Sequence, residues 1–340
     1  IVLAPGTYTP ASYTISDKYG IDIYGSGSGA ALDGNGMVTN TAPVFTFTDV
    51  YGLVISNLTI AGVVKETLNS PIAFDFSRCG GTRVNYVSIT NCVMCPNATV
   101  GKTTVYGVLA KVRDNAAVWF TDCNFNDNVF DNTISHKDHR VHAFVRGQGG
   151  YLTVNRCRFL RDTFKSKHTG FIMAGICNGR GQRIQKYPGM ANIRHSLFRW
   201  CGRSQEPDMV GVSVIAGAYT TGHGDNDAWY CNNYWYNCTF LDSYGIMAGN
   251  GANGTQYFYN CLFHRITAHG SNSDTACSKF GSGNSASACN LDFSYCMTDV
   301  EFDTLKNGLN AKATYHKVSD LPLIDDDGRP TDIVTASPLI

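Results

Sequence analysis

A short pattern of apolar and polar residues recurs along the chain. Each copy has apolar residues five and three positions before an anchor, usually Asn or Asp directly before it, and an apolar residue two positions after it. A fixed pattern with variable insertions is typical of a solenoid, in which each repeat forms one coil. The anchors are 23 to 42 residues apart and are Leu58, Cys92, Cys123, Cys157, Ser196, Cys238, Cys261 and Cys296.

The alternation inside this pattern predicts two strands joined by a bend. The anchor and the position two residues later continue the alternation one step out of phase with the positions before them. The bend residues are types that tolerate a left-handed backbone, and they are Asn57, Asn91, Asp122, Asn237 and Asn260. We therefore expect equivalent bend residues to stack and to share side-chain amide hydrogen bonds.

A third strand is predicted between consecutive copies, for example at 108–111, 143–147 and 244–249. The sequence thus predicts an all-β fold: a single right-handed parallel β-helix of about ten coils with three strands per coil. We expect one domain over 1–340, with opening coils in 1–50, central coils with cysteine and phenylalanine columns in 51–300, and a C-terminal coil and tail in 301–340. Its 43% hydrophobic and 16% charged residues favour a folded chain.

Over nearly its whole length the sequence resembles the right-handed β-helix superfamily of pectate lyases and their relatives. The recurring pattern carries this resemblance, together with the opening segment 21–27 and the closing segment 326–330. The resemblance implies a substrate cleft along the third strand and the loops beside it. Because this fold hosts lyases, hydrolases, epimerases, tailspikes and adhesins, it does not by itself imply one activity.

The thirteen cysteines follow the coil period more than a metal-ligand period. We interpret six of them as small apolar residues in one inward column: Cys92, Cys123, Cys157, Cys238, Cys261 and Cys296. Cys277 and Cys289 flank a Gly- and Ser-rich loop and could close it as a disulfide, in keeping with an oxidising compartment. We expect an extracellular or cell-surface protein, part of a larger surface protein or assembly, without membrane insertion.

Charge is balanced over the whole chain, with 27 basic and 27 acidic residues, but it is distributed unevenly. Residues 136–203 contain fourteen lysines and arginines against only Asp138 and Asp162. In a solenoid these residues would form a basic band around the rod, which would attract a polyanion. The expected partner is an acidic polysaccharide or another glycan. Nucleic acid is not expected, because no helix-in-groove or base-stacking module is present.

Candidate catalytic residues lie within this band and are Arg146, Lys165, Lys167, His168, Arg180 and Arg183. A uronate lyase must neutralise the substrate carboxylate, a role for Arg180 or Arg183, and abstract the neighbouring proton, a role for Lys165, Lys167 or His168. The alternative interpretation is that these residues are solvated loop charges without a substrate.

The loop 222–227 could bind calcium through Asp225 and Asp227, and calcium is the only cofactor that the sequence suggests. The alternative is that Asp and Asn form ordinary turns there. Nearby, Tyr234 and Tyr236 could stack on sugars, whereas Trp235 belongs to the predicted core.

Two functions remain open. The first is a carbohydrate-binding or lyase-like protein that acts on an acidic polysaccharide. The second is a noncatalytic structural or adhesive segment of a larger cell-surface or secreted protein.

Overall fold

The computed structural model describes the greater part of the N-terminal half of the chain and selected segments of the remainder. The described residues are 1–27, 29–35, 38–39, 43–65, 71–94, 106–132, 141–148, 150–166, 172–173, 176–179, 190–201, 212–213, 215–216, 232–243, 246–248, 254–265, 280–282, 289–298 and 312–317.

The largest sheet, sheet A, has 18 strands within these residues and extends from the first described strand to the last. Its strands are β1 (Val2–Leu3), β2 (Gly6–Tyr8), β4 (Asp22–Gly25), β5 (Ala30–Asp33), β8 (Val54–Ala61), β11 (Thr82–Thr90), β14 (Ala117–Thr121), β15 (Asn124–Asn126), β18 (Tyr151–Asn155), β19 (Arg158–Leu160), β23 (Met190–Arg194), β24 (Leu197–Arg199), β27 (Asn232–Tyr236), β28 (Thr239–Leu241), β30 (Gly254–Tyr259), β31 (Leu262–His264), β33 (Cys289–Thr298) and β34 (Lys312–Lys317).

Two further sheets complete the N-terminal and central coils. Sheet B contains β3 (Tyr13–Tyr19), β7 (Phe45–Tyr51), β10 (Phe74–Ser77), β13 (Tyr106–Arg113), β17 (Val141–Gln148) and β22 (Ile176–Gly179). Sheet C contains β6 (Val38–Thr39), β9 (Val64–Lys65), β12 (Val93–Met94), β16 (Val129–Asn132) and β20 (Thr163–Ser166). Shorter pairings join β21 (Ile172–Met173) to β25 (Val212–Ser213), and β29 (Ile246–Ala248) to β26 (Ile215–Ala216) and β32 (Phe280–Ser282).

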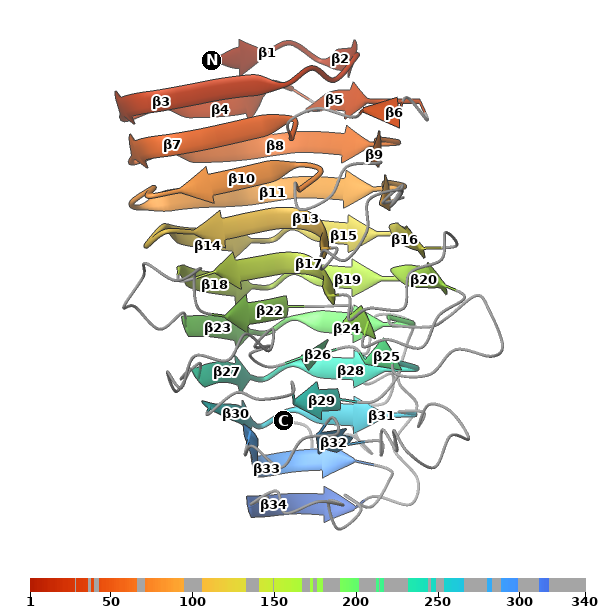
Figure 1. Ribbon diagram of the computed structural model, residues 1–340. Helices are drawn as coiled ribbons and strands as arrows, with labels where there is room; N and C mark the ends of the chain where they lie inside the picture. The colour runs from red at the N-terminus through yellow and green to blue at the C-terminus, as the bar shows by residue number, and fades with distance from the viewer. Residues whose placement is uncertain are drawn as a thin grey trace, which may run out of the picture.

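The sheets stack into a rod. Strands that are equivalent in successive coils lie one beneath another from the N-terminal strands to β34 (Figure 1). Neighbouring strands run parallel, as β8, β11 and β14 do in sheet A. The fold is therefore a right-handed parallel β-helix, as the sequence predicts. The number of coils and the domain boundaries stay predictions, because much of the C-terminal half lies outside the described residues.

The coil from Val54 to Ser77 shows how three strands close one turn. β8 belongs to sheet A, β9 to sheet C and β10 to sheet B. The two strands that the sequence predicts around each anchor are the two halves of one bent element in sheet A, and the strand in sheet C is not predicted. This strand is only two residues long in β9 and β12, too short to show an alternation.

Aromatic rings form a continuous stack inside the rod. Phe125, Phe159, Phe198, Phe240 and Phe263 stack face to face with centroid distances of 4.5 to 5.0 Å. All five are at most 1% exposed. The predicted phenylalanine column is therefore confirmed, and Trp235, which is 0% exposed, packs against it as predicted.

The inward cysteine column is confirmed at five of its six predicted positions, and Cys92 was assigned wrongly. The strand register pairs Val87 with Leu58, so Val87 and not Cys92 takes this place in its coil. Cys92 is buried in a second inward column, next to the strands of sheet C. The error arose because both columns follow a bend, and Asn91-Cys92 has the composition of the predicted motif.

The described central coils of sheet A are bent twice by residues with a positive φ, for example at Asn57 and Gly62 or at Asp122 and Asp127. At the first bend Asn57, Asp122, Asn237 and Asn260 have φ of 52° to 54°, as predicted. Asn91 also has a positive φ, but it lies at the second bend, and Tyr86 takes the first bend in its coil. The expected amide bond between stacked bends occurs where Asn260 Nδ2 donates to Asn237 Oδ1 at 2.7 Å.

The eight cysteines whose side chains the structure describes are free, buried thiols, namely Cys79, Cys92, Cys123, Cys157, Cys201, Cys238, Cys261 and Cys296. Their thiol groups donate hydrogen bonds to backbone carbonyls of the preceding coil. For example, Cys123 Sγ donates to the Val84 carbonyl at 3.3 Å, and Cys261 Sγ donates to the Trp235 carbonyl at 3.5 Å. Cys277 lies outside the described residues, so the disulfide with Cys289 stays a prediction.

Candidate functional site

The outward face of sheet B gathers polar side chains at consecutive coils. On its strands, buried residues such as Phe74, Phe76 and Val112 point into the rod, so the residues between them face outward. The register aligns Asp75 of β10 with Lys111 of β13. The outward positions form two columns: Thr14, Thr46, Asp75 and Lys111, and beside them Ser16, Thr48, Ser77 and Arg113. In the backbone register, Arg146 and Gln148 of β17 are the next positions after Lys111 and Arg113.

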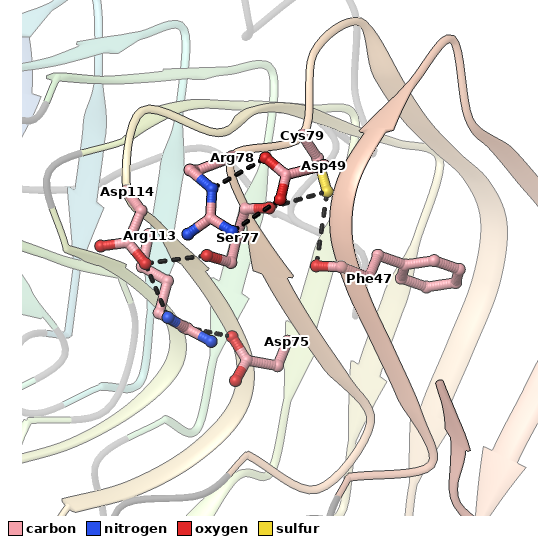
Figure 2. A network of polar contacts seen from close by, with 8 residues as sticks. All are labelled: Phe47, Asp49, Asp75, Ser77, Arg78, Cys79, Arg113 and Asp114. Atoms are coloured by element: carbon pink, nitrogen blue, oxygen red, sulfur yellow. Dashed lines mark hydrogen bonds and ion pairs between the residues drawn. The ribbon is translucent and has the colours of Figure 1, made fainter. Parts of the chain in front are cut away.

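Arg113 lies at the centre of a polar cluster on this face (Figure 2). Its Nε donates to Asp75 Oδ1 at 2.9 Å, and its Nη1 donates to Asp114 Oδ2 at 2.6 Å. The Ser77 hydroxyl donates to the same Asp114 oxygen at 2.8 Å. Burial alone would lower the pKa of Arg113, but the hydrogen bonds and charges of the two carboxylates outweigh it and raise this pKa. The guanidinium is therefore a permanent, fixed cation.

A second ion pair closes the cluster where the chain passes from sheet B to sheet A. Arg78 forms a bidentate contact with Asp49 of the preceding coil, at 2.8 and 2.6 Å (Figure 2). The hydrogen bond from Arg78 lowers the pKa of Asp49. Both residues have a positive φ, so this ion pair joins two stacked bends.

Lys65 is a buried cation that the sequence analysis missed. It takes an inward position on β9, above Met94 of β12, and it is 0% exposed. Its Nζ donates to the Pro71 carbonyl at 2.7 Å. Burial lowers the pKa of Lys65 to about 8, although the nearby charge of Asp75 opposes this shift. The apolar run Val63-Val64 before Lys65 was the available signal for its inward position.

The structure places two of the six candidate catalytic residues, and it places them on different sheets. Arg146 of β17 is the backbone register partner of Lys111 of β13 in sheet B. Lys165 is on β20 in sheet C, where the backbone register places it next to Asp131 of β16. The other candidates, Lys167, His168, Arg180 and Arg183, lie outside the described residues, as do the candidate calcium ligands Asp225 and Asp227.

Several arginines of the predicted basic band are paired with carboxylates from neighbouring coils. Arg156 contacts Asp122 at 2.8 and 2.7 Å, and Arg161 contacts Asp127 at 2.6 and 2.7 Å. Hydrogen bonding to Arg156 lowers the pKa of Asp122. Both aspartates precede residue 136, so a charge count over 136–203 overstates the positive charge of the band.

The two candidate sugar-stacking tyrosines each stack on a tyrosine of the next coil. Tyr234 stacks on Tyr257 at 4.9 Å, and Tyr236 stacks on Tyr259 at 5.2 Å. The Arg194 guanidinium also lies 5.3 Å from the centre of the Tyr236 ring. Tyr236 therefore has contacts that compete with a sugar for its ring, and one ring face of Tyr234 is taken by Tyr257.

Neither a metal centre nor a membrane span is evident in the part of the chain that the structure describes. There, no three His, Cys, Asp or Glu side chains come together as metal ligands. No helix in the same residues is both long and apolar enough to cross a bilayer.

No protein-family model matches the sequence, and no curated protein matches it either. Solved structures with a similar fold include a PL6 alginate lyase in complex with a trisaccharide, with 10% identity, a TM-score of 0.28, and coverage of 98% of this chain and 86% of that one. Tailspike protein 3 of bacteriophage CBA120 is 11% identical with a TM-score of 0.29, and the match covers 97% of this chain and 54% of the tailspike.

A third similar structure is the alginate lyase AlyF in complex with G6, at 11% identity and a TM-score of 0.24, with coverage of 99% of this chain and 88% of that one. At these identities and TM-scores we assign the chain to no family, and we base its function on its own residues.

Proposed function

We propose that the chain binds an acidic polysaccharide along the outward face of sheet B, with Lys111 and Arg146 as the principal basic positions. The observation that supports this proposal best is the register column Asp75, Lys111 and Arg146, which supplies one polar position per coil. Coils of a parallel sheet repeat about every 4.8 Å. This repeat is similar to the length of one sugar unit in an extended polysaccharide, so successive side chains can contact successive sugars.

The neighbouring positions suit such a ligand. Thr46 and Thr48 of β7 offer hydroxyl groups on the N-terminal side of the column. The hydrogen bonds of Arg113 to Asp75 and Asp114 hold its guanidinium in place, and they compensate the negative charge of Asp75. The face therefore changes from hydroxyl groups to cations along the rod, which would orient a chain that carries carboxylates.

We place this binding at the cell surface or in the extracellular space, where acidic polysaccharides occur. If the protein also cleaves its ligand, Arg146 is suited to neutralise a uronate carboxylate, and Lys165, Lys167 or His168 remains the candidate base.

Affinity electrophoresis in gels that contain alginate or heparin at low ionic strength tests the binding. Replacing both cations, Lys111→Gln with Arg146→Gln, should weaken binding at least about tenfold, or about 1.4 kcal/mol. The control is Arg156→Gln, which removes a cation that is paired with Asp122 at a bend. This control should bind nearly as tightly as the unmodified protein.

The proposal fails if the unmodified protein is retarded by neither polysaccharide, or if the control loses as much affinity as the double variant. The ultraviolet absorbance of unsaturated uronates in the same mixtures separates the two functions that the sequence leaves open. Growth of this absorbance would indicate a lyase, and binding without growth would indicate a noncatalytic adhesive protein.

A further inference from the structure

A second inward column runs beside the strands of sheet C and contains a buried acid. Each member directly follows the second bend of its coil, where Gly62, Asn91, Asp127, Arg161, Trp200 and Asp242 have a positive φ. The members are Val63, Cys92, Asn128, Asp162, Cys201 and Ser243. All of them are at most 2% exposed.

The polar members of this column repeat one contact with a backbone carbonyl of the preceding coil, which in Ser243 accompanies a shorter hydrogen bond to the Leu241 carbonyl at 2.8 Å. Asn128 Nδ2 donates to the Ile89 carbonyl at 3.0 Å, and Cys201 Sγ donates to the Phe159 carbonyl at 3.1 Å. Ser243 Oγ contacts the Phe198 carbonyl at 3.5 Å, and Cys92 Sγ contacts the Ile60 carbonyl at 3.9 Å. Each side chain thus contacts a carbonyl two residues beyond the first-bend anchor of the preceding coil.

These carbonyls form a series with one gap. The register aligns Ile60, Ile89, Phe125, Phe159 and Phe198 in consecutive coils. Phe125 lies in the coil before Asp162, so its carbonyl is the acceptor that corresponds to Asp162. An ionised aspartate has only acceptor oxygens and cannot donate this bond.

The contacts of Asp162 leave one of its oxygens for this role. Oδ1 accepts hydrogen bonds from the backbone N–H and the side-chain Nδ2 of Asn128, both at 2.9 Å. Oδ2 is buried and has no hydrogen-bond partner, and Asp162 is 0% exposed. A buried carboxylate oxygen without a donor is costly, whereas a protonated oxygen facing a carbonyl is satisfied.

We infer that Asp162 is a neutral carboxylic acid in the folded protein and that its Oδ2–H donates to the Phe125 carbonyl, so that the centre of the rod loosens as Asp162 loses its proton.

The surrounding charges are consistent with a neutral acid. Burial is the largest influence and raises the pKa of Asp162 well above its usual value, and the charge of Asp127 raises it further. The hydrogen bonds from Asn128 and the charge of Arg161 oppose this shift. Arg161 is, however, engaged by Asp127 at the surface. The flanking thiols Cys92 and Cys201 are neutral because burial raises their pKa values.

A raised folded-state pKa fixes the direction of the pH dependence. The stabilising effect of the proton is complete below the unfolded-state pKa of about 3.9 and is lost as the pH rises towards the folded-state pKa. Stability should therefore fall over this range because of Asp162. The β20 strand, which starts at the next residue and carries Lys165, should be affected first.

The test compares the unmodified protein with Asp162→Asn, which supplies a permanent donor as Asn128 does. Urea unfolding from pH 4 to pH 9 should show the folding equilibrium constant of Asp162→Asn rising relative to that of the unmodified protein by up to about tenfold per pH unit. The control, Asp122→Asn, removes an aspartate whose pKa is lowered by Arg156. Because both the folded and the unfolded protein carry Asp122 ionised above about pH 5, the deficit of this control should stay constant from pH 5 to pH 9.

A ratio between Asp162→Asn and the unmodified protein that does not change with pH would overturn the inference. If Asp162→Asn does not fold, infrared spectra of the unmodified protein decide. A protonated-carboxyl band that persists at pH 7 supports the neutral acid, and no such band at pH 7 overturns it.

Discussion

At the residue scale, the positions after the bends combine two tasks in one small side chain. They fill space in the core, and their polar atoms donate to a backbone carbonyl of the preceding coil. Cys157 shows both tasks, because it is 1% exposed and its Sγ donates to the Phe120 carbonyl at 3.5 Å. The same column accepts Ser196, whose Oγ receives the Cys157 N–H at 3.2 Å. Cysteine is therefore not required here, and since Leu58 and Val87 take the same position without a donor, the thiol hydrogen bond is an addition to the packing.

Substitutions at Cys157 test the contribution of this hydrogen bond. Cys157→Ala removes the bond to the Phe120 carbonyl and leaves a small cavity in the core, which together should cost about 1–3 kcal/mol of the free energy of unfolding. Cys157→Ser keeps a donor and should cost less than about 1 kcal/mol, as polar substitution in this column is already present at Ser196. Urea denaturation at constant pH measures both. A serine variant that is no more stable than the alanine variant would contradict the assignment.

At the element scale, the short strands of sheet C have buried polar residues within them or directly before them, namely Lys65, Asn128 and Asp162. The two-residue strand β9 buries the complete side chain of Lys65. Its hydrogen bond to the Pro71 carbonyl joins sheet C to the residues that enter β10 of sheet B. The cationic form is disfavoured by burial, so this link should depend on pH.

We expect the stability of the protein to rise with pH between about 8 and 10 because of Lys65. Its folded-state pKa of about 8 lies below the ordinary lysine value of 10.5, so the unfolded chain binds more protons in this range. In Lys65→Met, which resembles Met94 in the next coil, this contribution should be absent. Urea midpoints of the two proteins at pH 7, 8, 9 and 10 measure the difference, and parallel pH profiles would refute the expectation.

At the scale of the whole molecule, the repeated pattern was enough to predict a parallel β-helix, because each coil has to bury the same columns. The columns of Cys123, Cys157 and Phe159 were predicted from spacing alone and are confirmed. The wrong assignment of Cys92 shows the limit of prediction from spacing. Both bends of a coil are followed by a small buried residue, so the pattern does not distinguish the first bend from the second.

The candidate site was less predictable from sequence, and the reason is geometrical. The partner of each charged residue lies one coil away, as for Arg113 with Asp75 and Arg156 with Asp122. Such pairs are separated by 38 and 34 residues, and the length of each coil varies. Sequence distance therefore does not indicate which arginines are already paired, and Arg146 could be placed beside Lys111 only from the register.

Thiol reactivity can report whether the coils are closed, because the eight cysteines with described side chains are spread along the rod from Cys79 to Cys296. All eight are buried, and burial raises the pKa of Cys92 to about 12. In the native protein at pH 8 we expect these eight to resist a disulfide reagent, so that at most five of the thirteen cysteines react before urea is added. Rapid reaction of more than five would show that the rod is open at one or more coils.

The repeated bends also have a consequence for variation of the surface. In consecutive coils the first bend is formed by Tyr86, Asp122, Arg156 and His195, all with nearly the same φ of 49° to 54°. An aromatic, an acid, a base and an imidazole thus follow the same backbone path, while the core columns behind them keep their shape. The side chain at one of these bends can therefore be replaced without changing the backbone or the core. Proteins of this architecture can thus acquire new binding partners by surface substitutions in single coils.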